Sequence, residues 1–230
     1  APNAYAVLAG DFTNGTLTVN DTNYTGTAVF TGQNALTSLT VNRGVLTTYL
    51  TDGEDEFIGR MMNAALGGSL TVKNDAIVNL FAAEKLTGVT VERNAKLFAF
   101  DDVVTNDINN SGTIGLGGQS NTTGNITNSG KIAISNAIKT GNIANTGGIA
   151  LMGTTISTGN IANTGANAEI LIDGATSITT GDIVNSAALL SVRSDDITTG
   201  NITNSNAGNL WWFGKGDVNG SVLNNATANL

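Results

Sequence analysis

Hydrophobic residues recur in this chain at a regular spacing that is set by short polar turns. The phrase TGNIANTG occurs at 140–147 and again at 158–165, and near-copies begin at 123, 180 and 199. Each copy holds one isoleucine, and successive copies of it lie 17, 18, 22 and 19 residues apart. A period near twenty that persists over many copies is typical of proteins built from stacked coils.

Within each repeat, apolar and polar residues alternate over short stretches. KIAIS at 131–135, GIALM at 148–152 and EILID at 169–173 all follow a period of two, which predicts strands. No stretch long enough for a helical repeat fits between the Gly and Asn residues that interrupt the pattern. We therefore predict an all-β chain, a parallel β-solenoid with about 17–22 residues and three short faces per coil.

Stacked coils place equivalent residues in columns. The isoleucine of each phrase is expected to point inward and form a core column. The asparagine two residues later is expected to form a ladder of side-chain amide hydrogen bonds. The core column comprises Ile126, Ile143, Ile161, Ile183 and Ile202, and the ladder comprises Asn128, Asn145, Asn163, Asn185 and Asn204.

The first hundred residues repeat a looser version of the pattern. TLTVN at 16–20, SLTVN at 38–42, SLTVK at 69–73 and GVTVE at 88–92 each give a short alternation followed by a polar turn. The longest step between them contains 51–66, which we expect to project as an insertion from one coil. We interpret 1–230 as a single solenoid domain that has a C-terminal cap around 208–230.

Composition removes several classes of function. The chain has 230 residues, no cysteine and no histidine, so disulfide scaffolds, thiol nucleophiles, imidazole bases and the usual zinc sites are excluded. The net charge is −8 without a basic cluster, which argues against a nucleic-acid partner. The apolar runs are too short for a membrane-spanning segment. We predict no catalytic, cofactor-binding or metal-binding residue.

Several phrases are similar to those of a known group of surface proteins. SLTVNRGVL, SLTVKNDAIVNL, GVTVERNAKLFAF and NITNSGKIAIS resemble passenger regions of bacterial autotransporter and filamentous-haemagglutinin-like proteins. The resemblance extends from about residue 16 to residue 214. It implies a right-handed parallel β-helix, export across the outer membrane, and a role in adhesion or self-association.

The sequence LWWFG at 210–214 contains the main aromatic cluster. Trp211, Trp212 and Phe213 would suit a platform for sugar rings or for a partner protein. Strand alternation, however, turns at least one of the two tryptophans inward. We favour a core or cap role for the cluster, and we keep binding as the alternative.

Three other features contain residue types that can bind ions or carry out chemistry. The acidic stretch DGEDEF at 52–57 suits a solvated loop better than a calcium loop. Asp101 and Asp102, and Arg193 with Asp195 and Asp196, lack a motif that would support acid–base catalysis. The remaining feature is a threonine column, which we interpret as a turn-facing polar stack, with an ice-binding array as the alternative; it comprises Thr123, Thr140, Thr158, Thr180 and Thr199.

These features predict a non-enzymatic structural or adhesive β-solenoid at the bacterial cell surface or in the extracellular medium. Its partners would be other copies of itself, or a glycan or protein on a host or cell surface. An alternative is a self-assembling matrix or filament subunit whose coils stack end to end. A polysaccharide-degrading β-helix enzyme is less favoured, since no catalytic constellation is present.

Overall fold

A computed structural model of the chain describes residues 5–9, 14–19, 27–31, 36–48, 67–81, 83–186 and 188–229. The chain divides into two compact units, Ala1–Gly118 and Gln119–Leu230. Each unit is a parallel β-solenoid, as the sequence predicts, and its turns generally follow one another about 19 residues apart. The spacing is wider at the start of the first unit, where Thr16, Ser38 and Ser69 stack at steps of 22 and 31 residues. About nine coils and no helix occur among the described residues.

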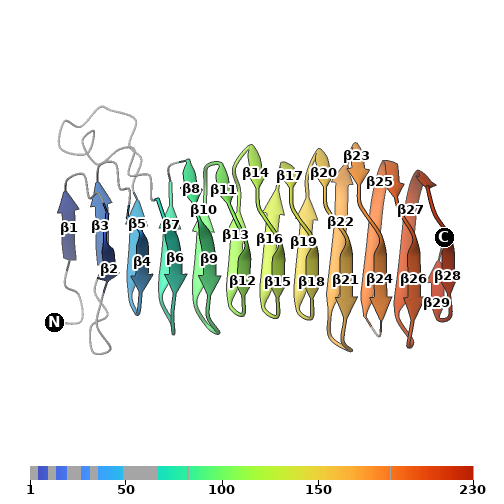
Figure 1. Ribbon diagram of the computed structural model, residues 1–230, viewed down its shortest axis with the longest axis horizontal. Helices are drawn as coiled ribbons and strands as arrows, with labels where there is room; N and C mark the ends of the chain where they lie inside the picture. Colours follow the sequence, from blue (N-terminus) through green and yellow to red (C-terminus); the bar gives the residue numbers. More distant parts are fainter. Residues whose placement is uncertain are drawn as a thin grey trace. The chain divides into compact units, whose positions relative to one another are not determined.

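The first unit consists of short strands that are stacked in parallel ladders, and the strands of successive coils lie side by side (Figure 1). One ladder runs β2–β4–β6–β9–β12, a second runs β1–β3–β5–β7–β10–β13, and β8 pairs with β11. The strands are β1 (Tyr5–Ala9), β2 (Thr16–Val19), β3 (Thr27–Thr31), β4 (Ser38–Val41), β5 (Val45–Thr48), β6 (Ser69–Val72), β7 (Ile77–Leu80), β8 (Glu84–Leu86), β9 (Gly88–Val91), β10 (Lys96–Ala99), β11 (Val103–Thr105), β12 (Ile108–Asn110) and β13 (Thr113–Leu116).

Register in the first unit follows the repeated SLTV phrase. Leu39 pairs with Leu70 and Val41 pairs with Val72, and all four side chains are buried. The serine and threonine that alternate with them face the other side of the strand and stay partly exposed. A shift by one residue would turn the whole apolar set outward, so the alternation itself specifies the pairing.

The second unit has three ladders that correspond to three faces of each coil. They run β15–β18–β21–β24–β26–β28, then β16–β19–β22–β25–β27–β29, then β14–β17–β20–β23–β25. The strands are β14 (Ser120–Thr122), β15 (Ile126–Asn128), β16 (Lys131–Ser135), β17 (Ala137–Lys139), β18 (Ile143–Asn145), β19 (Gly148–Met152), β20 (Thr155–Ser157), β21 (Ile161–Thr164), β22 (Glu169–Ala175), β23 (Ser177–Thr179), β24 (Ile183–Ser186), β25 (Leu189–Thr199), β26 (Ile202–Ser205), β27 (Asn209–Val218), β28 (Val222–Asn224) and β29 (Thr227–Asn229).

The isoleucine column forms the core of one face of this unit. Its members pair with one another from coil to coil in the order Ile126, Ile143, Ile161, Ile183 and Ile202. Each is at most 2% exposed. Burying such a side chain contributes about 1.5–3 kcal/mol, so the column is a main source of stability for the unit.

Two segments singled out in the sequence have different outcomes. The expected insertion at 51–66, with its acidic stretch at 52–57, lies outside the described residues. The segment expected as a cap forms β27, β28 and β29, which pair in parallel with β25, β26 and β27 respectively. In the described part of this segment, parallel pairing therefore continues, but the side chains of β28 are exposed, whereas those of β24 and β26 are alternately buried.

Candidate functional site

The asparagine column of the second unit forms a continuous chain of amide hydrogen bonds. Asn128 Nδ2 donates to Asn145 Oδ1 over 2.8 Å. The next three links, as far as Asn204, each measure 2.9 Å. Asn204 in turn donates to Asn224 Oδ1 over 2.9 Å, which adds a member that the sequence pattern did not include.

Most amides of this ladder also donate to a carbonyl oxygen of their own turn. Asn145 Nδ2 donates to the carbonyl oxygen of Gly147 over 2.8 Å, and Asn145 Oδ1 accepts the N–H of Gly147 over 3.1 Å. The ladder residues from Asn128 to Asn204 are at most 1% exposed. Buried amides that are bonded in this way stabilise the stack and present nothing to a ligand.

The threonine column is also buried. Thr123, Thr140, Thr158, Thr180 and Thr199 are at most 7% exposed. The hydroxyl of Thr140 donates to the carbonyl oxygen of Gly141 over 3.0 Å, and Thr158 repeats this contact with Gly159. These hydroxyls close the corners of the coils, so the column does not form an exposed array that ice could contact.

An exposed polar row was missed in the sequence analysis. Asn142 N–H donates to Asn125 Oδ1 over 2.9 Å, and Asn160 N–H donates to Asn142 Oδ1 over 2.8 Å. Asp182 and Asn201 continue the same pattern. The sequence does contain a pattern for this row, because each of these residues directly precedes the repeated isoleucine.

A shallow hollow lies beside this exposed row. It has a volume of about 450 Å³ and spans the outward side of β15, β18, β21 and β24. Its floor carries small side chains, among them Ala144, Ala162 and Val184. The hollow has no charged group other than Asp182 among its lining residues, so it offers little that would select one ligand.

The aromatic cluster lies on β27, and its side chains alternate between the inward and the outward side of the strand. Leu210 is fully buried and Trp212 is partly buried, as strand alternation predicts. Trp211 is 43% exposed and Phe213 is 50% exposed. Their ring centroids lie 6.4 Å apart at an interplanar angle of 83°, which is an edge-to-face contact. The structure therefore presents two of the three aromatic side chains at the surface.

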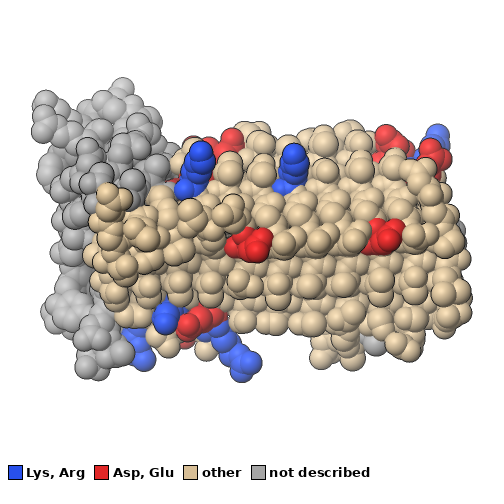
Figure 2. Space-filling view, in the orientation of Figure 1, with Lys and Arg blue, Asp and Glu red and all other residues tan. Residues whose placement is uncertain are grey.

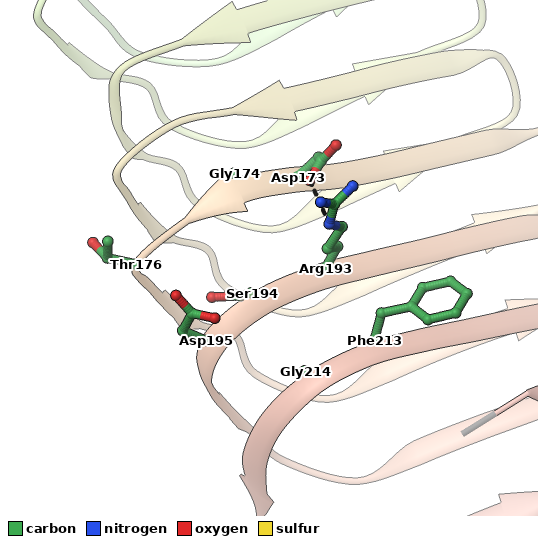
Figure 3. Close-up of a pocket in the computed structure, with 8 residues that line it drawn as sticks. All are labelled: Asp173, Gly174, Thr176, Arg193, Ser194, Asp195, Phe213 and Gly214. Atoms are coloured by element: carbon green, nitrogen blue, oxygen red, sulfur yellow. Dashed lines mark ion pairs between the residues drawn. The ribbon is translucent and has the colours of Figure 1, made fainter.

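Phe213 borders a pocket of about 370 Å³ where β22, β25 and β27 turn a corner (Figure 3). Asp173, Thr176, Arg193 and Asp195 also line it. Arg193 Nε lies 3.7 Å from Asp173 Oδ1. Two groups that the sequence analysis treated separately, the aromatic cluster and the Arg193–Asp195 stretch, therefore contribute to one concave site.

Hydrogen bonds at Asp196 and at the Asp101–Asp102 pair are made with residues close in sequence. Asp196 N–H donates to Ser194 Oγ over 3.3 Å, and the same hydroxyl donates to the Asp196 carbonyl oxygen over 3.1 Å. In the first unit, Asp102 N–H donates to Asp101 Oδ1 over 2.7 Å. Across the described ranges, no three His, Cys, Asp or Glu side chains gather in a way that would hold a metal ion.

The described part of the chain contains no helix that is long and apolar enough to cross a membrane. No protein-family model matches the chain, and no curated protein or solved structure is significantly similar to it.

Proposed function

We propose that this chain is a non-enzymatic structural and adhesive β-solenoid that works at the bacterial cell surface or in the extracellular medium. The observation that carries the proposal is that two separate rows of hydrogen bonds join the coils of the second unit. Buried asparagine amides link the coils on the inside, and the exposed row links them through backbone N–H groups. Coils joined in this way form a stiff support whose outer residues keep a fixed spacing.

The surface chemistry supports recognition by polar, uncharged groups. Figure 2 shows few charged side chains on a mostly uncharged face, some of them isolated and some in small groups of mixed sign. Lys and Arg together number 10 in 230 residues. Such a surface suits a glycan, a cell-surface protein or another copy of the chain, and it does not suit nucleic acid. The resemblance to autotransporter passengers supports the same role and location.

Adhesion tests the proposal directly. Beads coated with the full chain are expected to attach to cells, or to one another, more than albumin-coated beads do. Attachment should persist at high salt, because charge pairs contribute little to this surface. Absence of both attachment and aggregation would contradict the proposal. Release of new reducing ends from a panel of polysaccharides would contradict its non-enzymatic part.

End-to-end assembly into a matrix or filament is the second candidate. The amide ladder extends to Asn224 in β28, and the backbone groups of a parallel strand suit pairing with a further coil. That coil can belong to the same chain or to another copy. Electron microscopy of the chain at rising concentration distinguishes this candidate, since filaments of uniform width are expected only if copies stack.

A further inference from the structure

The corner pocket of the second unit arises from successive changes in coil length. Ile172 and Ala175 of β22 are three residues apart, but their partners on β25 are only two apart. The same loss of one residue recurs where β25 meets β27, between Ser194 and Ile197. Irregularities of this kind bend a strand and redirect its side chains. The corner therefore opens into a pocket at this place.

Two glycines line the pocket and contribute no side chain to it. Gly214 has φ of +141°, and a Cβ at this residue would collide with the carbonyl oxygen of Ser194. Gly174 has φ of +79° and faces open space. Both conformations favour glycine over any residue with a side chain. The walls are left to Asp173, Arg193 and Phe213.

One wall is an aromatic surface. The Phe213 ring is half exposed, and the edge-to-face contact with Trp211 holds it in place. Arg193 is the direct partner of Phe213 in the strand register, and its side chain extends toward Asp173 on the neighbouring strand (Figure 3). An exposed ring held in this way offers a flat apolar surface on which the C–H face of another ring can stack.

The other wall supplies hydrogen-bond donors and acceptors. Arg193 carries N–H donors, while Asp173 and Asp195 carry acceptor oxygens. The contact between Arg193 and Asp173 is loose, at 3.7 Å, and these side chains are 72% and 38% exposed. Exposed pairs of this kind contribute at most about 1 kcal/mol to stability. The stability of the fold therefore gains little from these charged residues at this place.

The charges narrow the class of ligand. A cation approaching the Phe213 ring would meet the guanidinium of Arg193, and an anion would meet the two carboxylates of Asp173 and Asp195. A neutral ligand that both donates and accepts hydrogen bonds, and that has one apolar face, fits all three groups. We propose that this corner pocket binds a neutral pyranose sugar of a glycan, stacked on Phe213 and hydrogen-bonded to Arg193, Asp173 and Asp195.

This proposal rests on the adhesive part of the proposed function and names its ligand. The test uses the full chain and calorimetry with neutral oligosaccharides built from glucose, mannose, galactose or N-acetylglucosamine. Sialylated and uronate oligosaccharides and a lysine-rich peptide serve as charged probes. Saturable binding of at least one neutral sugar is expected. Binding of charged probes alone, or of no probe, would overturn the assignment.

Variants locate the binding. Phe213→Ala and Arg193→Ala are expected to weaken the affinity for the neutral sugar about tenfold or more. The matched controls are Phe100→Ala and Arg93→Ala, which alter an exposed phenylalanine and an exposed arginine of the first unit and should leave the affinity unchanged. Unchanged circular dichroism spectra show that the variants fold. A neutral sugar that binds all variants equally would place the site elsewhere and overturn the assignment.

The two proposals fail in different ways. Beads coated with Phe213→Ala or Arg193→Ala are expected to lose the part of adhesion that free neutral sugar inhibits. Adhesion that is equal for all variants and insensitive to sugar would overturn the pocket assignment, and the adhesive function would stand. Absence of adhesion by the unmodified chain, together with retained sugar binding, would overturn the adhesive function alone.

Discussion

The side-chain amide of Asn145 donates a hydrogen bond of 2.9 Å to Asn163 Oδ1 in the next coil, and both side chains are buried. The isoleucines two residues before them, Ile143 and Ile161, are paired in the same register. One repeated phrase therefore provides both a core residue and a polar link to the next coil. This dual use explains why the phrase is repeated with little change.

Asn163→Ala is expected to destabilise the second unit. The substitution removes the donor to Asn185 Oδ1, and it leaves the Asn145 amide without its side-chain acceptor in the next coil. Because these groups are buried, the free energy of unfolding should fall by about 2–3 kcal/mol. Denaturant unfolding measures the change. Asn109→Ala, at an exposed position of β12, is the control and should shift it by less than about 0.5 kcal/mol.

Two adjacent glycines are expected to respond oppositely to alanine. A Cβ at Gly147 would collide with the carbonyl oxygen of Gly130, whereas a Cβ at Gly148 would meet no atom within 4 Å. Gly147→Ala should lower the free energy of unfolding by about 2–3 kcal/mol, because the backbone of the neighbouring coil cannot move aside. Gly148→Ala should be neutral or slightly stabilising. Equal midpoints of thermal unfolding for both variants would contradict the tight stacking of these turns.

Truncation of the core column should be far more damaging than truncation beside it. Ile183 is 1% exposed, whereas the next residue, Val184, is 41% exposed on the outward side of β24. Ile183→Ala should cost about 2–5 kcal/mol through lost burial and a cavity. Val184→Ala should cost less than about 1 kcal/mol. The two values come from the same denaturant titration, and a small effect of Ile183→Ala would argue against this core.

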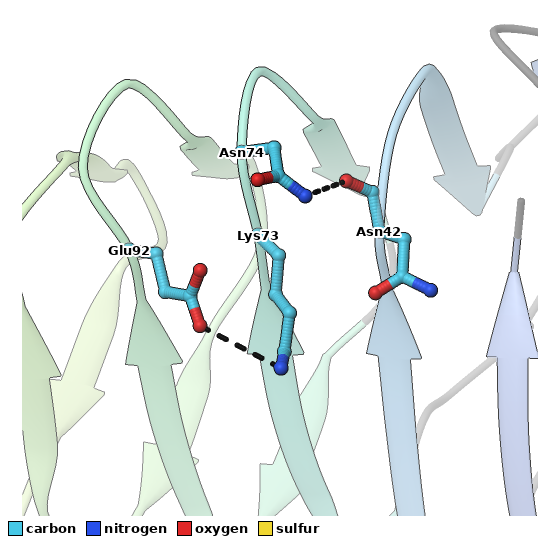
Figure 4. A network of polar contacts seen from close by, with 4 residues as sticks. All are labelled: Asn42, Lys73, Asn74 and Glu92. Carbon is cyan, nitrogen blue, oxygen red and sulfur yellow. Dashed lines mark hydrogen bonds and ion pairs between the residues drawn. The ribbon is translucent and has the colours of Figure 1, made fainter. Parts of the chain in front are cut away.

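A turn in the first unit depends on an unusual backbone conformation. Asn74 follows β6 with φ of +52°, and its Nδ2 donates to the carbonyl oxygen of Asn42 in the previous coil over 3.0 Å (Figure 4). Asparagine and glycine adopt this left-handed region more readily than other residues. Asn74→Ala should therefore cost about 1–2 kcal/mol in unfolding free energy.

Two further substitutions separate the causes at this turn. Asn74→Gly keeps the backbone conformation and loses only an exposed hydrogen bond, so its cost should be smaller than that of alanine. Lys73→Ala removes the neighbouring ion pair, in which Lys73 Nζ lies 3.7 Å from Glu92 Oε1 (Figure 4). This exposed pair should contribute less than about 1 kcal/mol. A glycine variant as unstable as the alanine variant would show that the hydrogen bond dominates.

Local pattern was sufficient to predict the coils. Alternation in stretches such as 131–135 shows which side chains turn inward, and the repeated Ile and Asn show which positions stack. The same reasoning overlooked the exposed row that starts at Asn125. Its members share a position in the repeat, but their bonds join side chains to backbone N–H groups of the next coil. Sequence alone does not show that geometry.

The corner pocket depended on the tertiary structure. Asp173 and Phe213 are forty residues apart in sequence and belong to different coils, and no motif connects them. They line one pocket because neighbouring coils differ by one residue at the corner. Such a difference appears in the sequence only as uneven repeat length. Whether it becomes a bulge, a loop or a change in register depends on how the stacked backbones pair in space.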